Sequence, residues 1–367
     1  MSAQTARTPV LKDSPMKTSW LSRDLNKVPT YVAIIVFVTL FVVGQVVYGS
    51  FFKFNTISSL LNDNAYLVIL AVAMTIPILT GGIDLSVGAV IALSSVIGCS
   101  MANAGVNWVV VTVVMILIGS VLGLISGTLV RYFDMQPFIA TLATMYLAQG
   151  IAAMISSQPI VLEKGYGLLR FGTKFKLIDG PKANDLKISV GFIVALLVVA
   201  AAYFVMHRTR SGRTIYAMGA PAKDSAVLMG LPTGRSLSLI YLMSGTMSGI
   251  ASVVYVGAVG KGQNIMGQGW ELNAVAAAVI GGTIITGGAG YVLGSVVGAW
   301  VFATMSLIIT RDGRIPPAAT TIITGLMLLL FVVIQRLIVF FAQRRERGGT
   351  TEGAAEPGES TPSEVAH

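Results

Sequence analysis

Long apolar runs separated by short polar connections dominate the chain. A transmembrane helix needs about 20 predominantly apolar residues, and most of these runs approach or exceed that length. The pattern therefore predicts an all-α, polytopic membrane protein with about ten transmembrane helices, some of them broken or re-entrant. The predicted spans are 30–49, 57–80, 85–103, 107–130, 137–155, 188–206, 236–257, 273–287, 290–310 and 317–340.

The runs form one transmembrane domain, predicted to cover 30–340, with a polar tail on each side. The N-terminal tail, 1–29, is basic. The C-terminal tail, 341–367, is rich in Gly, Ser, Thr, Pro and Glu and is predicted to be disordered. Within the domain, a basic loop at 207–235 joins the sixth and seventh spans. No small-residue cleavage site follows the first run, which is therefore predicted to be an uncleaved helix.

Basic residues divide unevenly between the two sides of this domain. With the N-terminus inside, fifteen Lys and Arg residues fall on the inner side and ten on the outer side. Basic loops favour the cytoplasm, so both termini and the loop at 207–235 are predicted to be cytoplasmic. Cationic loops at a lipid surface then account for the net charge of +9, and no nucleic-acid partner is expected.

Composition and motifs argue against an enzyme. Hydrophobic residues make up 54% of the chain and charged residues only 11%, against about 25% charged residues in soluble domains. A G-x-x-x-x-G-K-[ST] phosphate loop is absent from the sequence. Two histidines, one cysteine and no clustered acids predict no metal site, no internal disulfide and no cofactor bound by this chain.

The stretch "ILTGGIDLSVGAVIA" places a carboxylate in an apolar run. Gly81 and Gly82 each disfavour continuous helix by about 1 kcal/mol, which predicts a break between two helices. Asp84 and Ser86 are predicted to cap the second helix, whose N-terminus favours negative charge. Irregular backbone at membrane depth survives only beside protein or a water-filled cavity, so these residues are also candidates for lining a transport path.

Glycine spacing points to close helix packing elsewhere. Gly119, Gly123 and Gly127 stand four residues apart, as do Gly294 and Gly298, and small residues at this spacing let helix backbones approach closely in lipid. The tripeptide Thr-Gly-Gly also occurs twice, beginning at residues 80 and 286. We interpret this short match as chance or shared local geometry.

Polar side chains within predicted spans are further candidates for the transport path. Such groups are costly in lipid and tend to face the interior of the bundle. Their hydroxyl and amide groups suit a polyhydroxylated solute and suit interhelical hydrogen bonds equally well. The candidates are Asn62 and Asn64 on the second span and Thr141, Thr144 and Gln149 on the fifth.

The loop at 207–235 contains a short helical pattern between basic ends. Pro221 suits a first helical turn, and Gly230 followed by Pro232 ends the pattern. The segment is too short to span a membrane. Its apolar residues, Tyr216, Met218, Val227 and Leu228, are predicted to be exposed and to insert into a groove of a partner. The alternative is an ordinary surface loop.

Four motifs carry a resemblance to a known family over 30–340: "GGIDLSVGAVIA", "PFIATLATMYLAQGIA", "RTRSGRTIYAMGAPAKDSAVLMGL" and "ELNAVAAAVIGGTIITGGAGYVLGSVVGA". With them the chain resembles the inner-membrane permeases of carbohydrate-importing ABC transporters of the ribose/xylose/galactose type. Within that family it looks most similar to a permease of the galactofuranose importer.

The resemblance implies an importer that moves a sugar, a furanose such as galactofuranose, into the cytoplasm by alternating access. It implies a periplasmic sugar-binding protein, ATP-binding ABC subunits that hydrolyse ATP, and a second permease that is either another copy or a different chain. Segments 156–187 and 258–272 are candidate contacts for the binding protein. Alternatives are a permease for ribose, xylose or another small solute, including branched-chain amino acids, and an ion-coupled secondary carrier.

The resemblance also implies a coupling helix in the loop between the sixth and seventh spans. Pro221 stands where the family commonly has Asn, and one extra residue precedes Leu228. Gln149 stands where many relatives carry Arg, so no charge-based role is transferred to it. The residues expected to couple to the ATPase are Tyr216, Met218, Gly219, Ala220, Ser225, Leu228 and Gly230.

Overall fold

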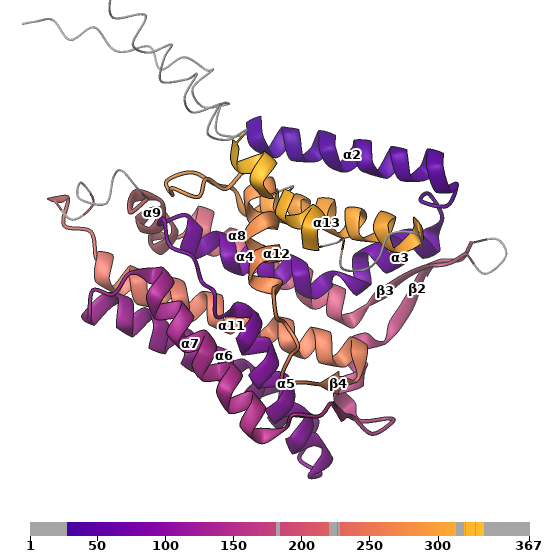
Figure 1. Cartoon of the computed structure of the whole chain (residues 1–367), viewed down its shortest axis with the longest axis horizontal. Helices are drawn as coiled ribbons and strands as arrows, with labels where there is room; N and C mark the ends of the chain where they lie inside the picture. The colour runs from indigo at the N-terminus through magenta and orange to yellow at the C-terminus, as the bar shows by residue number, and fades with distance from the viewer. Residues whose placement is uncertain are drawn as a thin grey trace, which may run out of the picture.

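The structure is a computed structural model that describes residues 28–180, 184–219, 226, 228–312, 319, 321–326 and 328–333. Helices dominate it (Figure 1). They are α2 (Val28–Tyr48), α3 (Phe54–Asp63), α4 (Ala65–Ile78), α5 (Val87–Asn103), α6 (Trp108–Tyr132), α7 (Pro137–Ile155), α8 (Val190–Arg208), α9 (Arg210–Ala217), α11 (Thr233–Val259), α12 (Trp270–Ile280) and α13 (Val292–Asp312).

Six of these helices, α2, α6, α7, α8, α11 and α13, are long and apolar enough to cross a membrane. Helices α3 and α4 together also have the length and composition of a span, but they are bent by 46° at their break, which fits either a broken span or a re-entrant loop. The predicted span 57–80 is therefore two helices. Each of the ten predicted segments contains helix in the described residues. The protein is therefore polytopic and mostly helical, while ten membrane crossings remain a prediction.

Two predicted spans are shorter than expected because glycines interrupt them. Helix α12 ends at Ile280, and the rest of the predicted span 273–287 is a turn whose Gly282 and Gly287 have φ values of 99° and 84°. L side chains rarely adopt this left-handed region, which glycine tolerates. Helix α5 starts at Val87 and has 17 residues. Both helices begin or end inside the bundle and leave irregular backbone next to them.

Short helices form the centre, and long ones surround them. Every residue of α4 except Tyr66 is buried, as expected for a helix that is hydrophobic all round. Figure 1 shows α2 and α13 on one side of α4 and α12, with α6, α7 and α11 on the other. The outer helices expose valine, leucine and isoleucine side chains, for example Val38 on α2 and Val121 on α6, which suits contact with lipid.

The predicted glycine packing is confirmed between α6 and α11. A Cβ on Gly119 would overlap the carbonyl oxygen of Gly245, and one on Gly123 would overlap that of Tyr241. A Cβ on Gly298 would likewise overlap the carbonyl oxygen of Ala277 on α12. Only glycine permits these backbones to approach so closely.

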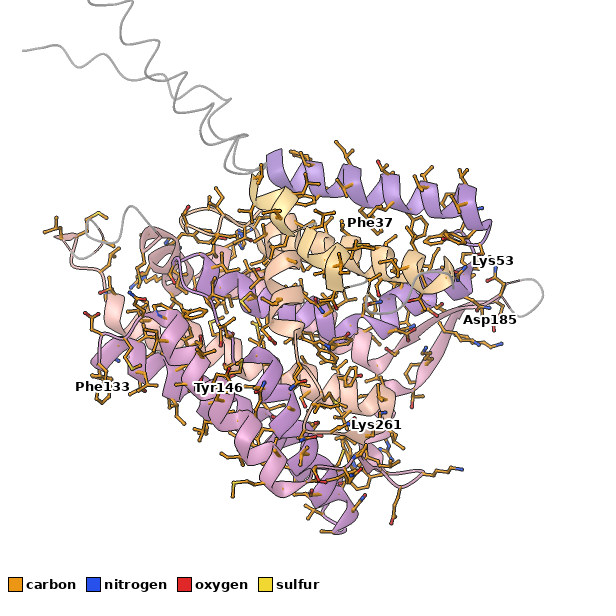
Figure 2. All side chains as sticks on the ribbon, viewed as in Figure 1. Phe37, Lys53, Phe133, Tyr146, Asp185 and Lys261 are labelled. Atoms are coloured by element: carbon orange, nitrogen blue, oxygen red, sulfur yellow. The ribbon has the colours of Figure 1, made fainter. Side chains whose placement is uncertain are left out.

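The all-α prediction missed two short antiparallel pairs. Strand β2 (Lys174–Ile178) pairs with β3 (Leu186–Ser189), and β1 (Ile160–Val161) pairs with β4 (Lys261–Gly262). A 3₁₀ helix, η1 (Gly167–Gly172), lies between them in the chain. We call this side of the bundle the hairpin end and the side with α9 the α9 end. In Figure 2, Lys53 and Asp185 lie at the hairpin end and Phe133 at the opposite side.

Candidate functional site

The break between α4 and α5 lies inside the bundle. Residues 79–86 leave the end of α4 in a turn in which the Gly82 N–H donates to the Pro77 carbonyl, and Gly81 has a φ of 76°. A Cβ on Gly82 would lie 2.6 Å from the Tyr241 hydroxyl and 3.2 Å from Pro137. Glycine therefore lets the break fit between the start of α7 and the middle of α11.

Asp84 is entirely buried in this break. Its Oδ1 accepts hydrogen bonds from the Ser86 backbone N–H at 3.0 Å and the Ser86 hydroxyl at 2.6 Å. Its Oδ2 accepts one from the Ser244 hydroxyl on α11 at 2.6 Å. A buried carboxylate is costly unless hydrogen-bonded. The two donors of Ser86 satisfy it within the break, and the Ser244 hydroxyl joins the break to α11.

The capping prediction is correct for one residue and wrong for the other. Asp84 accepts the N–H of Ser86, the residue that precedes the first turn of α5. Ser86 makes no side-chain capping bond to the helix, because its hydroxyl donates to the carboxylate instead. Asp84 therefore organises the turn, and Ser86 serves as its donor.

The threonines of α7 lie along the same region. The Thr141 hydroxyl is within hydrogen-bond distance of the Ile83 carbonyl in the break, at 3.1 Å, and of the Pro137 carbonyl, at 2.9 Å. One turn further, the Thr144 hydroxyl lies 2.8 Å from the Ser126 hydroxyl on α6. Both side chains are buried and bonded to protein, which matches the interhelical alternative. Their contact with a substrate stays a prediction.

The other polar candidates lie away from the break. Asn62 accepts the Ser189 N–H at 2.6 Å and donates to the Lys187 carbonyl at 2.8 Å, so it fastens α3 to β3. Asn64 donates to the Leu60 carbonyl at the junction of α3 and α4. Gln149 is half-buried on α7, about two helical turns beyond Thr141. The structure thus groups Asp84, Ser86 and Thr141 and leaves these three apart.

Two residues of α11, Ser244 and Tyr241, also lie against the break and were not predicted from the sequence. Besides Ser244, the Tyr241 side chain is fully buried, and its hydroxyl has no hydrogen-bond partner within the described part of the chain. The missed signal was the spacing of Ser244, Ser248 and Ser252. Hydroxyls four residues apart mark one helix face, and all three are buried.

Comparison with known proteins identifies the family. Residues 56–332, more than half of the chain, match the family described as branched-chain amino acid transport system / permease component. The chain belongs to this permease family. Fructose import permease protein FruG of Bifidobacterium longum is 50% identical over 294 residues, which cover 80% of this chain and 86% of that protein.

Two further relatives from Escherichia coli are more distant. D-allose transport system permease protein AlsC is 31% identical over 77% of this chain and 83% of its own length. Ribose import permease protein RbsC is 30% identical over 75% of this chain and 84% of its own length. No solved structure is significantly similar. The named relatives are permeases of sugar transport systems, which confirms the resemblance seen in the motifs.

The predicted coupling segment of the permease is only partly exposed. Leu228 and Met229 are 87% and 67% exposed at the α9 end, and Gly230 is exposed beside them. Met218 and Gly219 are buried and Tyr216 is half-buried, so the expectation that Tyr216 and Met218 project outward is wrong. The remaining predicted residues, Ala220, Ser225 and Val227, lie outside the described residues.

Met218 and Tyr216 face the permease itself. Met218 and Thr80 line a common cavity of about 190 Å³ at the α9 end, together with the turn between α6 and α7. The Tyr216 hydroxyl donates to the Gly290 carbonyl at 2.9 Å, and Gly290 lies in the loop between α12 and α13. Both side chains therefore point inward. Met218 lies beside the break after α4, and Tyr216 is bonded to the loop between α12 and α13.

The hairpin end of the permease carries a charged cluster. Asp185 lies 3.1 Å from the Lys176 ammonium and 3.7 Å from that of Lys187. The hydrogen bond from Lys176 lowers the pKa of Asp185, and the same bond raises the pKa of Lys176. The Asp185 carboxylate also accepts the Gly180 N–H at 3.3 Å, which ties the hairpin connection to its base.

Proposed function

We propose that this chain is the membrane permease of an ATP-driven sugar importer. The observation that carries this proposal is the 50% identity to a fructose import permease over 86% of that protein's length. The helical architecture supports it, because short interrupted helices at the centre of a bundle supply backbone that can rearrange between two access states.

Fructose is the first candidate substrate. The relatives named above are permeases for fructose, allose and ribose, and the fructose permease is clearly the more similar to this chain. None of the three is named for galactofuranose, so the finer resemblance to that importer gains no support from them. Ribose, allose and galactofuranose are the alternatives to compare with fructose.

The exposed surfaces at the two ends suit the two kinds of partner. At the α9 end, Leu228 and Met229 present apolar side chains that an ATP-binding ABC subunit would cover. At the hairpin end, the charged cluster and the extended strands offer a polar surface for a periplasmic sugar-binding protein. This assignment puts both termini in the cytoplasm and the permease in the inner membrane, beside a second permease that is a copy or a different chain.

Transport then needs no covalent chemistry on this chain. ATP binds and is hydrolysed on the partner subunits, and the permease converts their closure into alternating access. Polar groups at the helix break, Asp84, Ser86 and Thr141, are the central candidates for the pathway. Thr144, Gln149 and the asparagines of the second span are secondary candidates, because the structure places them at other contacts.

Reconstitution tests the proposal directly. The permease would be co-purified with the ATPase, the second permease and the binding protein encoded beside it, and placed in proteoliposomes containing ATP. Labelled fructose should accumulate only with ATP and binding protein present, and faster than ribose, allose or galactofuranose. Uptake that persists without the ATPase, driven by a proton or sodium gradient, would instead establish the ion-coupled carrier.

A further inference from the structure

The two Thr-Gly-Gly motifs of the chain meet in space. The backbone N–H of Gly288, in the second motif, donates to the carbonyl of Leu79, just before the first motif, at 2.9 Å. A Cβ on Gly81 would lie 3.4 Å from the Thr286 carbonyl oxygen. The earlier interpretation of this repeat as chance or shared local geometry is therefore incomplete. The first motif follows the end of α4, the second lies in the loop between α12 and α13, and a hydrogen bond joins that loop to the end of α4.

A third segment touches this contact. Gly219 lies two residues after the end of α9, and a Cβ there would overlap the backbone N and Cα of Gly288 and would lie 2.8 Å from the Leu79 carbonyl oxygen. Three stretches of backbone thus meet where only glycine fits. We call this contact of Leu79, Gly219 and Gly288 the glycine junction.

A hydrogen bond joins the same segment to the same loop. The Tyr216 hydroxyl donates to the Gly290 carbonyl at 2.9 Å. A Cβ on Gly290 would lie 2.9 Å from the Leu79 side chain. The segment 216–219 therefore contacts the loop between α12 and α13 at two points, by the close approach of Gly219 and by the bond of Tyr216, and that loop contacts the end of α4.

The junction leads by a short covalent path to the buried carboxylate. Asp84 is five positions after Leu79 in the chain and is bonded to Ser244 on α11, and the Ile83 carbonyl accepts from Thr141 on α7. Residues 216–219 are therefore in contact with the backbone at both helix breaks. The neighbouring cavity of about 190 Å³, lined by Met218 and Thr80, leaves space beside the segment for movement.

We propose that Gly219, Gly288 and Tyr216 are positioning residues that transmit movement of the coupling segment to both interrupted helices. This inference rests on the proposed function, since it needs an ATPase acting at the α9 end. It gives Gly219 a role inside the permease, whereas the sequence pattern assigned it to the ATPase contact. Packed elements of this kind switch between discrete arrangements rather than deform gradually.

Two variants separate transmission from folding. Gly219→Ala inserts a methyl group into the junction. Tyr216→Phe removes the hydroxyl that donates to the Gly290 carbonyl and that also lies 3.4 Å from His207 Nε2. The matched control for the first is Gly119→Ala, where a Cβ would overlap the Gly245 carbonyl oxygen between α6 and α11. The matched control for the second is Ser94→Ala, which removes a hydroxyl that donates to the Met115 carbonyl on α6 at 3.2 Å.

The measurement is sugar transported per ATP hydrolysed by the complete importer in proteoliposomes. Both junction variants should hydrolyse ATP at close to the normal rate and transport about 2- to 30-fold less sugar per ATP, the range known for residues that alter coupling without touching a ligand. Both controls should keep the normal ratio, whatever their effect on stability.

The outcomes are distinguishable. A normal ratio for Tyr216→Phe overturns the inference even where Gly219→Ala fails to assemble, because the phenylalanine variant changes no packing volume. An equal fall in the Ser94→Ala control overturns it too, since any lost hydroxyl-to-carbonyl bond would then have the same effect. If the unaltered importer moves no sugar with ATP, the proposed function itself fails, irrespective of the variants.

Discussion

The hydrogen bond between Ser244 and Asp84 is the contact that joins α11 to the helix break. The two oxygens are 2.6 Å apart, and both residues are entirely buried. Ser244→Ala removes the hydroxyl that donates to Oδ2 and leaves that oxygen buried without this donor. Leaving a buried acceptor unsatisfied costs about 1–3 kcal/mol, so the free energy of unfolding should fall by that amount.

Ser248→Ala is the matched control for this change. Ser248 is also buried on α11, one turn further along, but its hydroxyl donates to the Ser244 carbonyl of its own helix at 2.9 Å. Losing a neutral bond of this kind costs about 0.5–1.5 kcal/mol. Unfolding in detergent with increasing denaturant, followed by tryptophan fluorescence, measures both variants under identical conditions.

A double-mutant cycle with Asp84→Asn identifies the partner of Ser244. With an amide in place of the carboxyl group, removal of the hydroxyl should cost less, and the interaction energy should be about 0.5–3 kcal/mol, as for residues in direct contact. Equal destabilisation by Ser244→Ala and Ser248→Ala, with additive effects in the cycle, would refute the idea that this bond stabilises the buried carboxylate.

Three further predictions concern packing, pH and the hairpin. Gly123→Ala should destabilise the permease by about 1–3 kcal/mol in a thermal melt, because its methyl group overlaps α11; Gly150→Ala, in open space, should be neutral or slightly stabilising. Lys176 lowers the pKa of Asp185 in the folded protein. The stabilisation that this carboxylate provides is therefore fully present above its unfolded pKa of about 3.9. It is lost as the pH falls through the lower folded pKa. The protection of the hairpin amides against hydrogen exchange, relative to the intrinsic rate at each pH, should therefore fall in acid for the native chain and not for Asp185→Asn. Asn62→Ala removes two bonds to β3, so limited proteolysis within 156–189 should speed up; an unchanged digestion rate would contradict that anchoring role.

Helices and their interruptions follow from local sequence. Apolar runs locate α2, α6, α7, α8, α11 and α13 within a few residues, because a helix satisfies its backbone within one segment. Gly81, Gly82 and Gly282 mark where that backbone leaves the helix, since glycine adopts conformations that other residues avoid. The glycine repeat beginning at Gly119 also predicts a packing face without revealing which helix covers it.

Side-chain partners were less predictable than the helices. The strands were missed because β2 and β3 are short and lie between long apolar runs, where their pairing depends on Asn62 and on the Asp185 cluster. Ser86 was assigned to the helix, yet its hydroxyl meets a carboxylate two residues away. Met218 looked like an exposed apolar residue, and only its neighbours show that it is buried.

The sequence by itself determined that this protein is a helical membrane permease with interrupted central helices. Hydropathy, glycine positions and family motifs are properties of short segments, and they are readable without knowing what those segments touch. Tertiary structure alone decided that Ser244 holds Asp84, that Met218 points inward and that Leu79, Gly219 and Gly288 meet. The physical reason is that these contacts join residues far apart in the chain. Gly219 and Gly288 are 69 positions apart, and Leu79 and Gly288 are 209 positions apart. Such contacts depend on how whole helices pack, which no local pattern specifies.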